Sequence, residues 1–263
     1  MVLTKNHPTP WVALRGLTRE AGHWGEFAPQ LRDALAPHGL YTPDLPGNGR
    51  RWRDTSPTRV PALVDAVRAQ LLGEGLKPPY RLFGMSLGAM VCVAWADAHP
   101  HEVEACVLLN TSLRGVNPVY QRLRPQAWPA LARLAWPGLA AEATERIVFD
   151  ATSNTQDLDL RRATLRAWLA LRAEHSVSRA NALRQLLAAA RFRVPAERPR
   201  VPVLLLGSRG DRLVSPQCSE ALAARWHCDF AQHTDAGHDL PLDDGAWVVR
   251  QLVAWQARVL QRA

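Results

Sequence analysis

The sequence has no hydrophobic run that approaches the roughly 18 consecutive apolar residues of a membrane-spanning helix. Residues 1–8 also contain no apolar stretch of signal-peptide length. Both absences predict a cytoplasmic protein without a membrane span. With 47% hydrophobic and 21% charged residues, the composition is that of a globular protein and excludes disorder, collagen and coiled coil.

Cysteine is scarce, and its spacing excludes two classes of site. None of the four cysteines belongs to a Cys-x-x-Cys pair, which argues against a zinc site and against a redox motif. A chain of 263 residues also needs no disulfide to stabilise its core. We expect buried, reduced thiols at Cys92, Cys106, Cys218 and Cys228.

Lysine is nearly absent, since Lys5 and Lys77 are the only lysines among 32 basic residues and the rest are arginines. The formal net charge is +8, yet no basic run carries the interleaved aromatic residues that single-strand binders use. We therefore expect no nucleic-acid partner. The excess is uneven, because residues 116–195 hold twelve arginines against six acidic residues.

Short apolar runs alternate with longer segments of helical period, which is the rhythm of a parallel α/β sheet. Pro43 places the second strand at a sheet edge, where a missing N–H donor is tolerated. Strands are predicted at 11–14, 40–44, 80–84, 103–109, 201–207 and around Phe230. Helices are predicted at 27–36, 61–72, 87–98 and 245–260.

The rhythm breaks between residues 113 and 195, where only helical segments follow one another. These segments are predicted at 128–136, 141–149, 158–173 and 178–190. An all-helical insert within an α/β frame is typical of a cap or lid. The domains expected are therefore a core, 1–112 with 196–263, and a helical cap, 113–195, inserted after the fourth strand.

The run Gly84-Met85-Ser86-Leu87-Gly88 has the form Gly-x-Ser-x-Gly and lies directly between a predicted strand and a predicted helix. A turn that tight leaves little room for side chains two residues before or after the serine. It exposes the serine oxygen above the sheet, with the N–H groups of a helix N-terminus beneath it. The pattern predicts a nucleophile at Ser86; the alternative is a chance turn serine.

A serine hydroxyl needs a base and a group that orients the base. His238 follows the last predicted strand in a Gly-His turn, whereas His227 and His233 do not. Asp211 follows the strand at 201–207 and is the orienting acid we predict; Asp239 is the second candidate and otherwise a solvated loop acid. The chain order Ser, Asp, His is that of α/β-hydrolases.

Acyl transfer also requires backbone donors for the oxyanion of the tetrahedral intermediate. One expected donor is the N–H of Leu87, the residue after the nucleophile. The other is the N–H of Leu17, in the loop after the first strand. This chemistry needs neither a metal nor an organic cofactor.

These motifs together resemble the α/β-hydrolase superfamily. The resemblance covers nearly the whole chain. It rests on four motifs: residues 84–88, Asp211 with Val214-Ser215-Pro216 shortly after it, Gly237-His238, and Asp44-Leu45-Pro46-Gly47-Asn48-Gly49. The plan is similar to small serine carboxylesterases of the pimeloyl-carrier-protein methyl esterase and lactone or enol-ester hydrolase type. Because only ten residues precede the first strand, we expect the family's first two antiparallel strands to be missing, and therefore a six-stranded, all-parallel sheet flanked by helices.

The resemblance has two departures, because Arg15 and Asn48 stand where the family usually has histidines. Arg15 would bring a cation to the acyl pocket, where it binds either a substrate carboxylate or loop carbonyls. Other pocket candidates are Met85, beside the nucleophile, and Trp128 and Trp168 of the insert, which either line the pocket or pack the insert on the core.

Arginines cluster on the predicted helix 158–173, where Arg162 and Arg166 lie four residues apart beside Arg161 and Arg172. Like charges at this spacing repel. One interpretation is a surface that binds an acidic carrier protein, or a carboxylate or phosphate substrate. The other is a solvated face on which Asp157 and Asp159 pair with Arg161 and Arg162.

The sequence thus predicts a serine hydrolase that cleaves a carboxylic ester or thioester through an acyl-enzyme on Ser86. Its substrate would be a small-molecule ester or thioester. That substrate would either bear a carboxylate or be attached to an acidic carrier protein. The alternatives are an acyltransferase or a C–C bond hydrolase or lyase on the same fold, and a non-catalytic ligand-binding member.

Overall fold

The computed structural model describes residues 9–36 and 38–259, and these contain one six-stranded, all-parallel sheet. The strand order is β2-β1-β3-β4-β5-β6. As Pro43 predicts, β2 lies at an edge of the sheet. The strands are β1 (Trp11–Leu14), β2 (Leu40–Tyr41), β3 (Tyr80–Met85), β4 (Val103–Leu109), β5 (Val203–Ser208) and β6 (Asp229–His233). The predicted fold class is confirmed.

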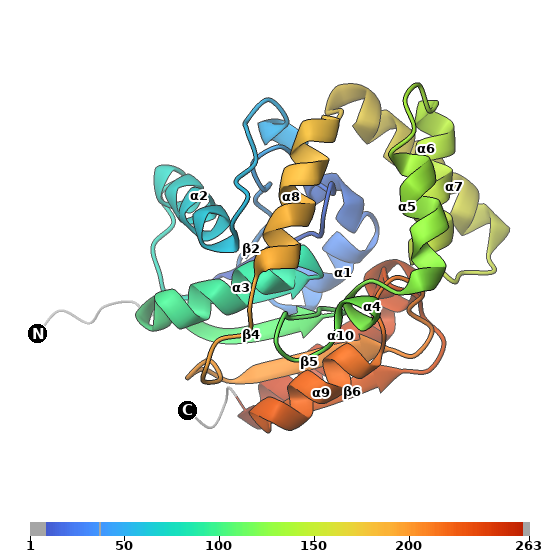
Figure 1. Cartoon of the computed structure of the whole chain (residues 1–263). Helices are drawn as coiled ribbons and strands as arrows, with labels where there is room; N and C mark the ends of the chain where they lie inside the picture. The colour runs from blue at the N-terminus through green and yellow to red at the C-terminus, as the bar shows by residue number, and fades with distance from the viewer. Residues whose placement is uncertain (1–8, 37, 260–263) are drawn as a thin grey trace, which may run out of the picture.

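Helices cover both faces of this sheet (Figure 1). They are α1 (Phe27–Ala34), α2 (Val60–Gly73), α3 (Leu87–Ala98), α9 (Gln217–Trp226) and α10 (Leu240–Val259). Residues of α2, α3 and α9 pack with one set of strand side chains, and residues of α1 and α10 pack with the other set. Burial on both faces explains why the central strands are continuous apolar runs and do not alternate.

Element boundaries agree best where an apolar pattern is continuous. The bounds of β1, α3 and β4 are those predicted, whereas α9 was missed although its buried Cys218, Leu222 and Trp226 recur at helical spacing. The last helix begins at Leu240, earlier than predicted, and has a kink at Asp244 just before the predicted start. The predicted end of that helix, residue 260, lies outside the described residues, as do residues 1–8.

The interval between β4 and β5 is helical, as expected for 113–195. It contains α4 (Val119–Arg122), which was not predicted, α5 (Trp128–Leu134), α6 (Ala141–Thr152), α7 (Leu158–Glu174) and α8 (Arg179–Arg191). An isolated bridge between Arg114 and Arg193 joins the two ends of this insert, and a second one links Arg114 to Asn117. Figure 1 shows α5, α6 and α7 together at one side of the molecule, while α8 contacts α3.

Four single-turn helices complete the described elements: Ala21–Trp24, Gly49–Arg51, Pro100–Glu102 and Pro125–Ala127. The thiols of Cys92, Cys106 and Cys218 are free and buried, and that of Cys228 is partly buried. Burial raises the pKa of the Cys218 thiol to about 12. None of the helices in 9–36 and 38–259 is long and apolar enough to cross a membrane.

Candidate active site

Ser86 lies in a strained turn between β3 and α3. Its backbone has φ 54° and ψ −116°, a region that non-glycine residues rarely adopt. A Cβ on Gly84 would lie 2.6 Å from the carbonyl oxygen of Gly88, and a Cβ on Gly88 would overlap the carbonyl oxygen of Leu14. These close approaches explain the two glycines that flank the serine in the motif.

Asp211 and His238 form a buried pair in the loops after β5 and β6. The distance from His238 Nδ1 to Asp211 Oδ2 is 2.7 Å, and the two residues are 3% and 1% exposed. The other oxygen of Asp211 accepts hydrogen bonds from the backbone N–H groups of Leu213 and Val214, both at 2.8 Å. The Ser86 hydroxyl lines the same cavity as His238 but makes no hydrogen bond with it in the described part of the chain.

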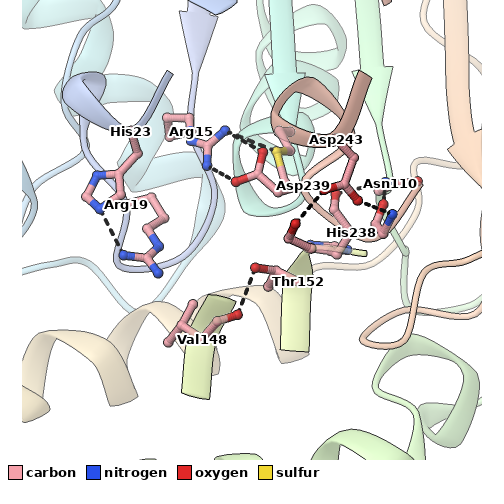
Figure 2. Close-up of polar contacts among 12 residues, drawn as sticks. Arg15, Arg19, His23, Asn110, Val148, Thr152, His238, Asp239 and Asp243 are labelled. Carbon is pink, nitrogen blue, oxygen red and sulfur yellow. Dashed lines mark hydrogen bonds and ion pairs between the residues drawn. The ribbon is translucent and has the colours of Figure 1, made fainter. Parts of the chain in front are cut away.

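Asn110, at the carboxyl end of β4, binds the backbone of the His238 loop (Figure 2). Its Nδ2 donates to the carbonyl oxygens of His238 at 2.9 Å and Gly237 at 3.3 Å, and to Ser208 Oγ at 3.1 Å. Sequence reasoning missed this residue. The signal was present, because polar residues just after a buried parallel strand lie at the edge where α/β proteins build their sites.

The C-terminal end of α6 binds the same loop from the insert side. Asp243 accepts hydrogen bonds from the backbone N–H groups of Asn154 at 2.8 Å and Gly237 at 2.6 Å. The N–H of Asp239 donates to the carbonyl oxygen of Thr152 at 2.7 Å. Figure 2 shows Thr152 and Asp243 beside His238. The insert therefore binds the backbone after His238 directly, through Thr152, and reaches the backbone before it through Asp243 of α10, which Asn154 also binds.

The loop after β1 passes close to Ser86. A Cβ on Gly16 would lie 3.7 Å from Ser86 Oγ, and the turn is closed by a hydrogen bond from Arg19 N–H to the Gly16 carbonyl at 3.2 Å. Leu17 lies in this turn, and Leu87 is the first residue of α3. Both expected oxyanion donors therefore belong to segments adjacent to the serine.

A cavity of about 130 Å³ connects these groups. Ser86, His238, Leu17, Arg15 and Met85 line one side of it. Its other wall is apolar and comes mostly from α5 and α6: Ala130, Leu131, Leu134, Val148, Ala151 and Leu213. The volume is well below the roughly 300–1,000 Å³ of pockets for drug-sized ligands, so the space suits a small chemical group.

The two tryptophan candidates do not line this cavity. Trp128 is 51% exposed, and its indole N–H donates to the carbonyl oxygen of Leu123. Trp168 is buried and packs on Phe149, with a distance of 5.7 Å between ring centroids. Aliphatic residues, mostly of α5 and α6, form the wall in their place, because Trp168 packs the insert on His23 and Arg19 of the core and Trp128 faces solvent.

Arg15 and Asp239 bind each other, which the sequence analysis did not predict. They form a buried two-pronged ion pair, with distances of 3.1 Å and 2.6 Å. The Arg15 guanidinium also lies 4.6 Å from the ring centroid of Trp24 and 3.4 Å from Met85 Sδ. Asp239 is therefore neither a solvated acid nor a partner of His238. Arg15 lines the cavity, but its guanidinium binds Asp239, which corrects both expected partners, a substrate carboxylate and loop carbonyls.

A second buried charge cluster, missed from the sequence, joins the core loop to the insert. Arg19 and Arg172 share the carboxylate of Glu145, at 2.7 Å and 3.1 Å. The Arg19 guanidinium lies 4.1 Å from the centroid of Trp168, and its Nη1 is 2.8 Å from His23 Nε2 (Figure 2). Burial lowers the pKa of Arg19; burial and the nearby arginines hold the pKa of His23 well below its usual value.

The arginines of α7 are mostly paired. The pairs are Arg161–Asp150, Arg162–Asp159 and Arg172–Glu145. The predicted partner Asp157 instead caps the helix by accepting from the N–H groups of Asp159 and Leu160. Arg166 is exposed and has no ion pair with the described residues. Arg162 therefore pairs with Asp159, as the interpretation of a solvated face predicts. Arg161 pairs with Asp150 and not with the predicted Asp157.

The six-stranded parallel sheet with a serine at its β3–α3 turn defines an α/β-hydrolase architecture. Among solved structures, the enol-lactonase from Burkholderia xenovorans LB400 matches with a TM-score of 0.76 and 18% identity, covering 97% of this chain and 94% of that one. A thermophilic esterase from Thermogutta terrifontis matches with a TM-score of 0.72 and 20% identity, covering 95% and 90%. At these identities the likeness shows the fold.

The sequence comparisons give the family. A family model described as the alpha/beta hydrolase family matches residues 12–251, and the chain belongs to this family of hydrolases. The pimeloyl-acyl-carrier-protein methyl ester esterase of Aromatoleum aromaticum is 32% identical over 82% of this chain and 88% of its own. The protein of the same name from Xylella fastidiosa strain 9a5c is 27% identical over 83% and 84%.

Proposed function

We propose that the protein hydrolyses carboxylic esters through an acyl-enzyme on Ser86. The observation that carries the proposal is the buried 2.7 Å pair of His238 and Asp211, which shares one apolar cavity with the strained serine. An apolar wall excludes water from the acyl group, while the polar side of the cavity holds the reacting groups. The relatives named as esterases support the same reaction class.

We propose the following proton transfers, which the pairing of His238 Nδ1 with Asp211 supports. Ser86 Oγ attacks the ester carbonyl carbon, and its proton passes to His238 Nε2. The bond to the alcohol then breaks, the alcohol takes that proton, and the acyl group remains on Ser86. Water, deprotonated by His238, next cleaves the acyl-enzyme. Asp211 keeps the other imidazole proton on Nδ1 and stabilises the imidazolium.

The oxyanion of both tetrahedral intermediates would lie between the N–H groups of Leu87 and Leu17. Leu87 N–H belongs to the free first turn of α3, where backbone donors have no intrahelical acceptor. Leu17 N–H belongs to the turn that passes over Ser86. Each such donor is worth about 10²–10³ in kcat in serine hydrolases.

The test is hydrolysis of p-nitrophenyl acetate, butyrate and octanoate by the wild type and by Ser86→Ala. We expect kcat to fall by at least about a thousandfold in the variant, since removal of the triad serine lowers kcat by about 10⁶ in a serine protease with such a triad. The small cavity predicts that acetate and butyrate are cleaved faster than octanoate. A thermal unfolding curve of the variant serves as the control for folding.

Activity that survives in a folded Ser86→Ala protein would contradict the proposal. Added alcohols distinguish the acyltransferase alternative, because a transferase forms the new ester in preference to the free acid. An inactive, folded wild type that a fluorophosphonate labels at Ser86 would indicate a specialised substrate or C–C bond cleavage. An inactive, folded wild type that the fluorophosphonate does not label would favour the non-catalytic, ligand-binding alternative.

A carrier-borne ester is the specialised substrate that we propose to test. The relatives above are named for a methyl ester on an acyl carrier protein. In this chain, twelve arginines against six acids within 116–195 supply a positive surface, and the exposed Arg166 has no ion pair with the described residues. We also propose that 113–195 acts as the cap over a core of 1–112 and 196–263, because α5 and α6 supply the apolar wall of the cavity.

A further inference from the structure

Two fully buried side-chain amides connect the insert to the core. Gln185 lies on α8 and Asn48 lies in the loop after β2, and both are 0% exposed. Gln185 Oε1 accepts a hydrogen bond from the N–H of Thr18 at 2.8 Å. Gln185 Nε2 donates to Asn48 Oδ1 at 2.7 Å and to the Pro46 carbonyl at 3.4 Å.

The chain of amides closes on the loop where it began. Asn48 Nδ2 donates to the carbonyl oxygen of Arg19 at 2.9 Å. The two amides therefore bind the loop at two successive residues, through Thr18 N–H and through Arg19 C=O. All four polar atoms of the pair Gln185 and Asn48 are satisfied, as a buried polar network requires.

The loop needs this support because Thr18 has an unfavourable backbone conformation. Its φ is +58°, in the left-handed region that glycine ordinarily occupies at the third position of such a turn. A β-branched residue with positive φ is a genuine outlier. Strain of this kind persists only where surrounding contacts hold it. The hydrogen bond to Gln185 is such a contact.

The strained turn is the one that carries the proposed oxyanion donor. Thr18 follows Leu17 directly, and Gly16 lies against Ser86. The orientation of the peptide between Leu17 and Thr18 sets the direction of the N–H that Gln185 binds. Without that hydrogen bond the Leu17–Thr18 peptide can rotate and the strained Thr18 backbone can relax, which would shift the turn that also carries the Leu17 N–H.

We infer that Gln185 is a positioning residue for the oxyanion hole, acting with Asn48 through the turn at Thr18. This inference rests on the proposed function. It makes helix α8 of the insert part of the catalytic apparatus, because displacement of α8 would remove the acceptor of Thr18 N–H. Gln185 touches no reacting atom, so its loss should lower kcat and leave KM nearly unchanged.

Asn181 provides a matched control one helical turn earlier. It also lies on α8, is 6% exposed, and joins the insert to the core through a side-chain amide. Its Oδ1 accepts from Ser56 N–H at 2.9 Å, and its Nδ2 donates to the Asp54 carbonyl at 2.9 Å. The chemistry matches that of Gln185, but the backbone it binds lies away from the turn at Thr18.

The experiment compares Gln185→Met with Asn181→Leu, both nearly isosteric, on p-nitrophenyl butyrate. We expect kcat to fall about 10- to 100-fold in Gln185→Met, part of the loss seen when an oxyanion donor is removed, with KM within about threefold. Asn181→Leu should keep kcat within about twofold at a similar loss of Tm. Affinity for a trifluoromethyl ketone, whose adduct carries the oxyanion, should fall in Gln185→Met by the same factor as kcat/KM.

A gentler pair covers the case in which the apolar variants do not fold. Gln185→Asn and Asn181→Ser each keep a polar group and bury no charge, but shorten the side chain, so Gln185→Asn should still lower kcat and Asn181→Ser should not. Equal losses of kcat at Gln185 and Asn181, or no loss at Gln185, would overturn the inference. Failure of the proposed function is recognised separately, since the wild type would then lack activity that depends on Ser86.

Discussion

At the residue scale, buried charges next to the serine are organised in pairs and not left free for substrate. Arg15 has Asp239, and Arg19 has Glu145, all four within a buried region. Removing one member of such a pair leaves an uncompensated charge in a medium of low polarity, which costs more than the pair contributes. The two pairs therefore constrain which substitutions the site tolerates.

The first prediction concerns the pair of Arg15 and Asp239. Arg15→Met should lower the free energy of unfolding by about 3–5 kcal/mol, because it leaves the Asp239 carboxylate buried and unpaired. The double variant Arg15→Met, Asp239→Leu should recover much of that loss, since neither charge remains. Urea denaturation of the wild type, both single variants and the double variant measures the coupling. Additive effects would contradict a direct interaction.

The second prediction concerns pH and His23. Its two ring nitrogens face donors, Arg19 Nη1 and Glu20 N–H, and burial with nearby arginines lowers its pKa well below the usual value. The unfolded chain therefore binds a proton near pH 6.5 that the folded chain does not bind. The unfolding free energy should fall as the pH drops below that value, and the stabilisation is fully present above it.

His23→Gln isolates this effect. Between pH 7.5 and 5.5 the wild type should lose about 1 kcal/mol more stability than the variant, the amount expected for one group that is neutral only in the folded state. Urea denaturation at the two pH values measures it, and His101→Gln, at an exposed position, is the control. An equal pH dependence in the wild type and His23→Gln would refute the linkage.

At the element scale, the end of α6 and the start of α10 fix the loop that carries His238. Asp243 receives N–H groups from Asn154 and Gly237, and a Cβ on Gly237 would lie 2.5 Å from the Thr152 carbonyl. These contacts leave the His238 backbone little freedom. The insert thus supports the base on one side of the cavity, as α8 supports the turn at Thr18 on the other.

The third prediction tests this support. Asp243→Asn replaces a charged acceptor of backbone N–H groups by a neutral one, and hydrogen bonds to charged groups are about twice as strong as neutral ones. We expect kcat to fall by about tenfold and Tm by a few degrees. Asp235→Asn, exposed in the same loop, should leave both unchanged. A variant at Asp243 that retains full kcat would show that the base is held by other contacts.

The sequence predicted those features of the site that depend on local pattern. Ser86 follows from glycines flanking it between a strand and a helix, and His238 and Asp211 follow from loops after buried strands. The boundaries of β4 and α3 follow from continuous apolar runs. Each of these signals lies within a single stretch of chain, so no knowledge of the folded arrangement was needed.

Contacts between distant segments were not predictable. Arg15 and Asp239 are 224 residues apart, and Thr18 and Gln185 are 167 residues apart. Which acid neutralises an arginine depends on how two loops approach each other in the folded molecule, and residue type alone does not encode it. The same reason explains why Trp168 packs the insert on the core and why aliphatic residues of α5 and α6 line the cavity.

At the scale of the whole molecule, positive charge is concentrated on the insert. Residues 116–195 carry six of the eight net charges, twelve arginines less six acids. Among residues 9–36 and 38–259, ion pairs neutralise Arg161 and Arg162 of α7 but not Arg166. An acidic carrier protein that approached this face would be attracted over about 10 Å at 0.1 M salt, the range beyond which exposed charges are screened.

The fourth prediction distinguishes a carrier-borne ester from a free one. For a methyl ester on an acyl carrier protein, kcat/KM should fall about tenfold between 50 and 300 mM salt, because screening slows association of oppositely charged proteins. Neutral p-nitrophenyl butyrate has no such attraction, so its kcat/KM should change little. Arg166→Gln should weaken turnover of the carrier substrate alone, whereas Arg32→Gln, at an exposed position on α1, should affect neither substrate. Turnover of the carrier-borne ester that is indifferent to salt and to Arg166 would show that the insert's charge does not bind the carrier.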